Sequence, residues 1–149
     1  MCAASFGRLF LEDVQMQANR FPITSVPLWQ RVVAIIALIF GALTLFSGGS
    51  ILFGPESARA AAGNYVPFVL WFNFIAGLFY VLAAVGIWLG RAWALPLSIV
   101  IALATLLIAL LFLYHILVGE AYEMRTVVAL GLRTGVWGVI ALALYRRQK

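Results

Sequence analysis

Four long apolar segments constrain this chain more than any other feature of its sequence. They cover residues 32–53, 65–89, 92–118 and 125–145, and each has the ~20 residues needed to cross a hydrocarbon core about 30 Å thick. Because backbone N–H and C=O groups must be paired in lipid, only helices and closed barrels are viable there. The apolar runs show no period-two alternation, which favours helices over barrel strands. The sequence therefore predicts an all-α, four-helix transmembrane bundle.

Composition and charge agree with a membrane location. The chain has 149 residues, of which 65% are hydrophobic and 10% are charged, whereas a soluble domain is about half apolar and about a quarter charged. A net charge of +5 in a soluble protein would indicate nucleic acid. Here the basic residues are distributed as expected for membrane topology, so we expect lipids, and not nucleic acid, around the chain.

The turns and the basic residues predict the topology. Short turns near residues 90–91 and 119–124 force consecutive helices to run antiparallel, up and down. Basic residues accumulate in cytoplasmic loops, and the two sides of this bundle differ strongly. Two basic residues, Arg59 and Arg125, lie on one side. On the other side lie seven, which places both termini in the cytoplasm: Arg8, Arg20, Arg31, Arg91, Arg146, Arg147 and Lys149.

Residues 1–28 form a separate N-terminal cytoplasmic or interfacial segment ahead of the transmembrane domain, residues 29–149. Several of its apolar residues fall near one helical face, so it is either a short helix in the membrane interface or a loosely ordered tail. Its Cys2 is the single cysteine, so no internal disulfide and no cysteine-based metal cluster can form. Cys2 is either acylated or a free thiol. Residues 54–64, with Gly and Pro at their start, are predicted to form a loop.

Arg133 is the only charge clearly embedded in an apolar segment. A charged side chain in lipid costs at least a few kcal/mol, so it needs a partner or a wet cavity. At ~1.5 Å per residue, Arg133 lies ~12 Å below the outer end of its helix. The four helices together place polar residues in the same outer-leaflet layer: Thr44, Ser47, Asn73, His115, Arg133 and Thr134. No acidic residue lies at that depth.

Two interpretations of Arg133 follow from this layer. In the functional one, Arg133 lines an outward-facing polar pocket with Asn73, Ser47, Thr44 and His115. Its guanidinium then binds an anionic or carbonyl-bearing ligand, such as a lipid head group or a quinone, or meets an acidic residue of a partner subunit. In the structural one, the guanidinium bonds to Asn73, hydroxyls and helix carbonyls, or snorkels outward.

Small residues predict where helices approach closely. Gly131, Gly135 and Gly138 form one ridge, and Arg133 points about 200° away from Gly131. If Arg133 faces the bundle, this ridge faces outward and suits a partner protein or another copy; otherwise it packs on a neighbouring helix of the same bundle. A second stripe, with 4-3-4 spacing, is expected to face inward from the second helix: Asn73, Gly77, Tyr80 and Ala84.

Catalytic and metal chemistry find little support in the sequence. No P-loop, G-x-S-x-G or H-E-x-x-H motif is present, so we expect neither enzyme activity nor a cofactor. His115 lies near Glu120, Glu123 and Met124, but one histidine with flexible loop ligands is a poor metal site. A proton relay between His115 and Glu120 is the chemical alternative.

Several stretches resemble small bacterial four-span membrane proteins. They are residues 68–77, 86–91, 122–126 and 132–135. In size and layout, residues 30–146 also resemble the DoxX-like proteins. The resemblance implies a bacterial inner-membrane location and brings no defined activity or ligand.

Three functions are compatible with these features. The first is a non-catalytic accessory or assembly subunit of a larger membrane complex, or a homo-oligomer, motivated by the glycine ridge and the unpaired Arg133. The second is a small oligomeric carrier of protons or an organic anion. The third is a lipid-binding, quinone-binding or redox membrane protein.

Overall fold

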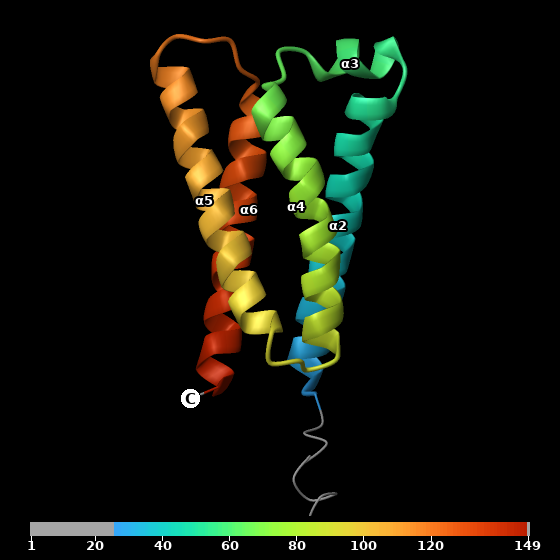
Figure 1. Cartoon of the computed structure of the whole chain (residues 1–149), viewed down its shortest axis with the longest axis vertical. Helices are drawn as coiled ribbons and strands as arrows, with labels where there is room; N and C mark the ends of the chain where they lie inside the picture. The colour runs from blue at the N-terminus through green and yellow to red at the C-terminus, as the bar shows by residue number, and fades with distance from the viewer. Residues whose placement is uncertain (1–25, 149) are drawn as a thin grey trace, which may run out of the picture.

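The computed structural model describes residues 26–148. Cys2 and residues 1–25 of the predicted interfacial segment lie outside this range. Four long helices run alternately up and down (Figure 1). All four are long and apolar enough to cross a membrane. This confirms the all-α bundle, and the chain is a multi-pass integral membrane protein. The helices are α2 (Leu28–Phe53), α4 (Pro67–Trp88), α5 (Ala94–Leu117) and α6 (Met124–Gln148).

The connection between α2 and α4 contains a short helix, α3 (Glu56–Ala62), so the prediction of a loop across residues 54–64 was wrong. Its sequence is rich in alanine, with Glu56 in the first turn and Arg59 in the last. Both charges interact favourably with the helix dipole and so stabilise the helix. The Arg59 side chain also donates to the Gly54 carbonyl at 3.3 Å. We call this end of the bundle the α3 end and the other the C-terminal end.

Glycines in the left-handed region make two of the tight turns. Gly90 has φ +63°, and the N–H of Arg91 bonds to the Gly86 carbonyl at 2.9 Å. Gly119 has φ +86° and ends α5 in the same way. These are Schellman motifs, in which the residue after the last helical turn favours glycine because a Cβ atom is strained there.

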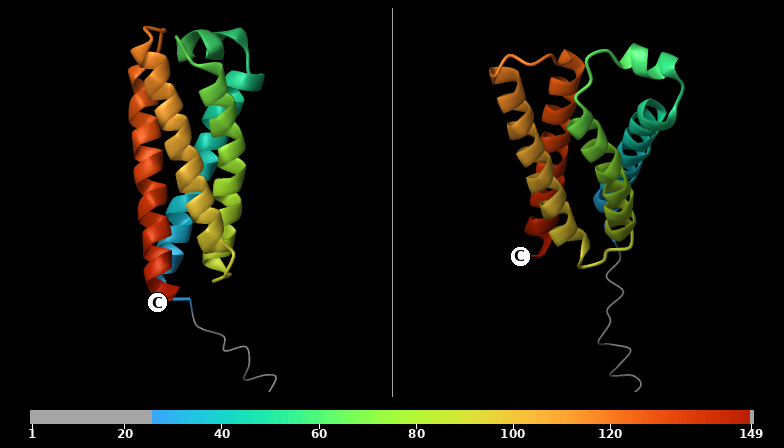
Figure 2. Two further views of the ribbon diagram at one scale, coloured as in Figure 1. Left: turned by 60° about the vertical axis from the view of Figure 1, so that its left-hand side comes forward. Right: turned by 45° about the horizontal axis from the view of Figure 1, so that its top comes forward.

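The helices pack as two pairs, α2 with α4 and α5 with α6, while α5 also contacts α4. The two pairs diverge toward the α3 end (Figure 2). In the first pair, α2 presents a row of small buried residues at alternating intervals of three and four, which we call the small-residue seam: Ala34, Ala37, Gly41, Thr44 and Gly48. Small residues let helix backbones approach closely in lipid.

Glycines on both helices mark the closest approach of α2 and α4. A Cβ atom on Gly41 would lie 3.0 Å from the Val81 side chain. A Cβ atom on Gly77 would lie 2.9 Å from Cγ of Leu45 and 3.3 Å from its backbone nitrogen. Gly77, Tyr80 and Ala84 are all buried, so the inward stripe predicted on the second helix is confirmed at these three positions.

Large side chains fill the space between the two helix pairs. Tyr80 from α4 and Trp137 from α6 are both fully buried, with ring centroids 4.8 Å apart. Ile87, Ile140 and Leu144 continue this core toward the C-terminal end. A smaller cluster lies at the α3 end and includes Val69, Phe112 and Leu130.

Replacing Gly77 by leucine should destabilise the bundle, because its side chain has no room against α2. Overpacking of this kind costs about 1–3 kcal/mol. Thermal unfolding in detergent should show Gly77→Leu unfolding at a lower temperature than the wild type. The matched control is Gly135→Leu, where a Cβ atom meets no described atom within 4 Å. Equal losses in both variants would contradict a specific role for the α2–α4 contact.

Candidate functional site: a cavity around Arg133

A cavity of about 330 Å³ lies at the α3 end, between α2, α4 and α6. Its volume falls within the range of small-molecule sites. Its lining contains both polar and apolar side chains. The Arg133 cavity is lined by Ser47, Ile51, Ala62, Tyr65, Val66, Val69, Leu70, Asn73, Arg125, Thr126, Ala129 and Arg133.

Helical periodicity on α6 places Arg133 inside the bundle. Thr126, Ala129, Arg133 and Trp137 follow one another at intervals of three and four, so they share one face of the helix. Trp137, at the lower end of this face, is fully buried. The Arg133 side chain therefore enters the bundle directly above the aromatic core.

The Arg133 guanidinium lies over an aromatic ring and has no counter-ion among the described residues. Its Cζ atom lies 5.9 Å from the centre of the Phe40 ring. Its Nε atom is buried and has no hydrogen-bond partner among residues 26–148. No carboxylate in that range forms an ion pair with it; the single such pair joins Arg125 to Glu123 at 3.9 Å.

Asn73 provides a second unpaired polar atom at the cavity. Its Oδ1 is buried and finds no hydrogen-bond partner in the described part of the chain. Arg133 Nε offers a donor and Asn73 Oδ1 an acceptor, yet the two do not bond to each other. The direct Arg133–Asn73 bond of the structural interpretation is therefore not formed, and both atoms are left unpaired.

The five residues predicted to line one pocket divide into two groups. Arg133, Asn73 and Ser47 line the Arg133 cavity. Thr44 is buried in the α2–α4 seam and His115 lies on α5, so neither contributes to its lining. Thr134, from the same layer, donates to the Leu130 carbonyl at 2.9 Å, as hydroxyls in membrane helices commonly do.

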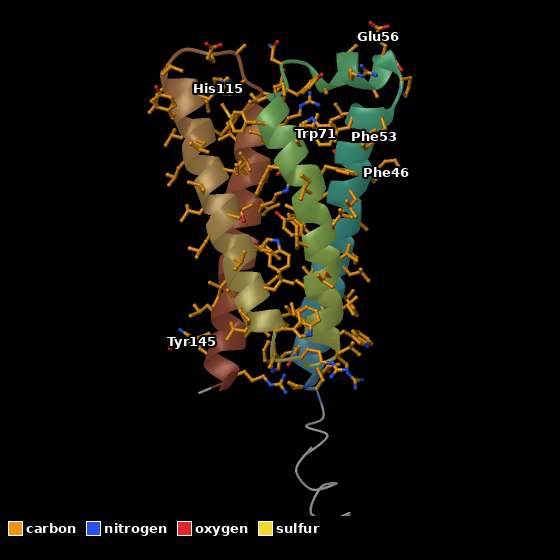
Figure 3. All side chains as sticks on the ribbon, in the orientation of Figure 1. Phe46, Phe53, Glu56, Trp71, His115 and Tyr145 are labelled. Carbon is orange, nitrogen blue, oxygen red and sulfur yellow. The ribbon has the colours of Figure 1, made fainter. Side chains whose placement is uncertain are left out.

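His115 belongs to a separate, aromatic environment. Its ring packs against Phe68 and Phe112, with centroids 6.1 and 6.2 Å away. Its Nε2 lies 3.3 Å from the Ala121 carbonyl. Figure 3 places it at the end of α5, beside the connection to α6. Glu123, from that connection, instead accepts a bond from the Asn64 N–H at 3.0 Å, so it ties two loops together.

The glycine ridge of α6 faces away from the cavity. Gly131, Gly135 and Gly138 are exposed, and a Cβ atom on any of them would meet no described atom within 4 Å. Of the two arrangements left open by the sequence, the glycines take the one in which the ridge faces away from the described helices. Arg133 and the ridge lie on opposite faces of one helix.

Sequence reasoning missed Arg125, Thr126 and Tyr65 as cavity residues. Arg125 was counted only for topology, although its position eight residues before Arg133 leaves the two within about 80° of each other around the helix. That spacing was the available signal. With Arg125 included, the cavity has two basic and no acidic lining residues, so its electrostatics favour an anionic group.

Comparison with protein-family models, curated proteins and solved structures finds no match to this chain. The resemblance to DoxX-like proteins stays a prediction.

Replacing Arg133 by leucine should stabilise the lipid-stripped protein, because a buried cation without a counter-ion is replaced by an apolar side chain. Such replacements gain up to about 1–4 kcal/mol. Thermal unfolding in detergent measures the effect. As a control, Arg125→Leu should change stability by less than about 1 kcal/mol, since the Arg125 side chain is 73% exposed. A marked destabilisation of Arg133→Leu would instead identify the guanidinium as a structural anchor.

Proposed function

We propose that this protein is a non-catalytic membrane protein that binds an amphiphile through its anionic head group in the Arg133 cavity. The observation that carries the proposal is the pair of buried, unpartnered polar atoms, Arg133 Nε and Asn73 Oδ1, at a cavity with two arginines and no acidic lining residue. Unpaired buried groups of this kind cost free energy until a ligand satisfies them.

The position of the cavity supports a ligand that arrives from the membrane. Its walls on two sides come from α2 and α6, which diverge toward the α3 end (Figure 2). The apolar part of the lining includes Ile51, Val69 and Leu70, and these residues suit an acyl chain. The polar part suits a carboxylate or phosphate, which a guanidinium binds with two parallel hydrogen bonds.

The orientation belongs to the same proposal. The excess of basic residues at the C-terminal end supports placing that end in the cytoplasm and the Arg133 cavity in the outer leaflet. The resemblance to small bacterial four-span proteins supports the inner membrane of a bacterium.

Palmitate provides a direct test, with hexadecanol as the uncharged analogue. Native mass spectrometry of lipid-stripped protein in mild detergent should show palmitate bound and hexadecanol bound more weakly. Arg133→Leu should weaken palmitate binding roughly 10- to 100-fold, because a hydrogen bond to a charged group contributes about 1.5–3 kcal/mol.

The matched control for this test is Arg59→Leu. Arg59 is an exposed cation at the same end of the bundle, and it does not line the cavity. It should bind palmitate as the wild type does. Equal losses in both variants would show that palmitate responds to surface charge alone. Equal binding of hexadecanol would rule out an anion-selective site.

The outward glycine ridge favours a second function, that of an accessory subunit or homo-oligomer. The space beside Gly41 of α2 and Gly77 of α4 is occupied by the opposite helix, whereas a Cβ atom on the ridge glycines of α6 would meet no described atom within 4 Å. Because glycine in a helix costs about 1 kcal/mol relative to alanine, three on one face are best explained by a helix that packs there.

Gly135→Leu tests this second function without disturbing the cavity. It should abolish a copurifying partner or self-association in mild detergent, while palmitate binding is retained. Ala42→Leu, which enlarges an exposed small residue on α2, is the control and should leave the association intact. If the association survives in Gly135→Leu, the ridge is not the interface.

A further inference from the structure

A second polar cavity lies at the C-terminal end of the bundle, independent of the Arg133 cavity. It occupies about 200 Å³ where α2 and α5 begin and α4 and α6 end. Figure 3 shows nitrogen-tipped side chains gathered at this end of the bundle. The Gln30 cavity is lined by Gln30, Gly90, Arg91, Ala92, Ala94, Leu95, Leu144 and Arg147.

Gln30 is the buried polar residue of this cavity, with 2% of its surface exposed. Its Nε2 donates to the Ile87 carbonyl at 2.6 Å, and this bond ties α2 to α4. Its Oε1 is buried and has no hydrogen-bond partner within residues 26–148. An unpaired amide oxygen in such a place calls for a hydrogen-bond donor.

Two arginines bring positive charge to the same cavity. Arg91 follows Gly90 in the Schellman turn, where its N–H bonds to the Gly86 carbonyl at 2.9 Å, so its backbone is fixed at the cavity. Arg147 comes from the last turn of α6. Both side chains are exposed, and the lining contains no carboxylate. The first residues of α5 add the positive end of a helix dipole.

We propose that the Gln30 cavity binds the phosphate of an anionic phospholipid that carries a hydroxylated head group. Arg91 and Arg147 hold the phosphate oxygens, and a head-group hydroxyl donates to Gln30 Oε1. The remaining lining residues Leu95 and Leu144 contact the apolar part of the lipid. Basic pockets between membrane helices at a bundle end are suited to such head groups.

Phosphatidylglycerol is the probe, because it has both a phosphate and free hydroxyls. Native mass spectrometry of the full, lipid-stripped chain should show phosphatidylglycerol bound in preference to phosphatidylcholine. The double variant Arg91→Gln/Arg147→Gln should lose roughly tenfold or more in phosphatidylglycerol occupancy. The control, Arg31→Gln/Arg146→Gln, removes equal charge from residues outside the cavity lining and should lose less than about twofold.

A near-isosteric change at Gln30 tests its place in the site. Gln30→Glu places a carboxylate beside the two arginines, so it should displace the lipid phosphate, and it replaces the donor to the Ile87 carbonyl, so the unfolding temperature should fall. Phosphatidylglycerol binding per folded protein, which native mass spectrometry reads directly, should fall roughly tenfold. Unchanged lipid binding in this variant would overturn the assignment of Gln30.

Two further outcomes distinguish the source of the phosphate and the site. If inorganic phosphate at equal concentration displaces phosphatidylglycerol, the ligand is a free phosphate and the lipid assignment fails. Arg133→Leu should bind phosphatidylglycerol normally, and Arg91→Gln/Arg147→Gln should bind palmitate normally. Loss of phosphatidylglycerol in Arg133→Leu would assign the lipid to the other cavity. If both double variants lose phosphatidylglycerol binding equally, the binding depends on surface charge and not on the Gln30 cavity.

Discussion

The close approach of α2 and α4 along the small-residue seam determines the rest of the structure. With Gly41 and Gly77 at the contact, these two helices pack against each other along their length and act as one unit. Large side chains pack between this unit and the α5–α6 pair. Tyr80 and Trp137 do so in the middle of the bundle. Above them, α2 and α6 lie apart at the α3 end (Figure 2), and the Arg133 cavity is lined by α2, α4 and α6.

Arg133 and the glycine ridge, which the sequence analysis assigned to one partner, lie on opposite faces of α6. An unpaired arginine and a glycine ridge together indicate a partner that supplies both a carboxylate and a helix surface. In the bundle, however, Arg133 faces a cavity among α2, α4 and α6, whereas Gly131 and Gly135 face outward. One helix packed on the ridge cannot bring its side chains to the guanidinium. The proposed ligand binding and the proposed association therefore depend on opposite faces of α6, and variants on these faces test them one at a time.

Position along the helix axis could be predicted from the sequence, whereas direction around each helix could not. A constant rise per residue grouped Arg133, Asn73 and Ser47, and these three residues line one cavity. The same reasoning included Thr44 and His115, which are on other faces of their helices. In a soluble protein the hydrophobic period would identify the inward face. In lipid both faces are apolar, so the inward face depends on packing details such as the seam at Gly41, which hydrophobicity does not reveal.

The region around α3 and the position of Arg125 also show features that the sequence predicted and features that depend on packing. The Pro and Gly residues around α3 marked a break between two spans, and the break is present. They also concealed a short helix, because the alanine-rich run between them is too short to show a period. Arg125 was assigned to topology since a rim charge needs no further explanation. Only the arrangement of α2, α4 and α6 around the cavity shows that Arg125 shares this cavity with Arg133.

The aromatic layer between the two cavities bears on whether the protein binds its ligand or moves it. Tyr80 and Trp137 are fully buried and separate the Arg133 cavity from the Gln30 cavity. Their polar atoms, the Tyr80 hydroxyl and Trp137 Nε1, have no hydrogen-bond partners in the described chain. A carrier would have to open this layer, which requires the two helix pairs to move apart where the Tyr80 and Trp137 rings pack. A binding protein needs no such movement, because each cavity is reached from its own end of the bundle. The packing of Tyr80 on Trp137 therefore favours binding over transport for a single chain.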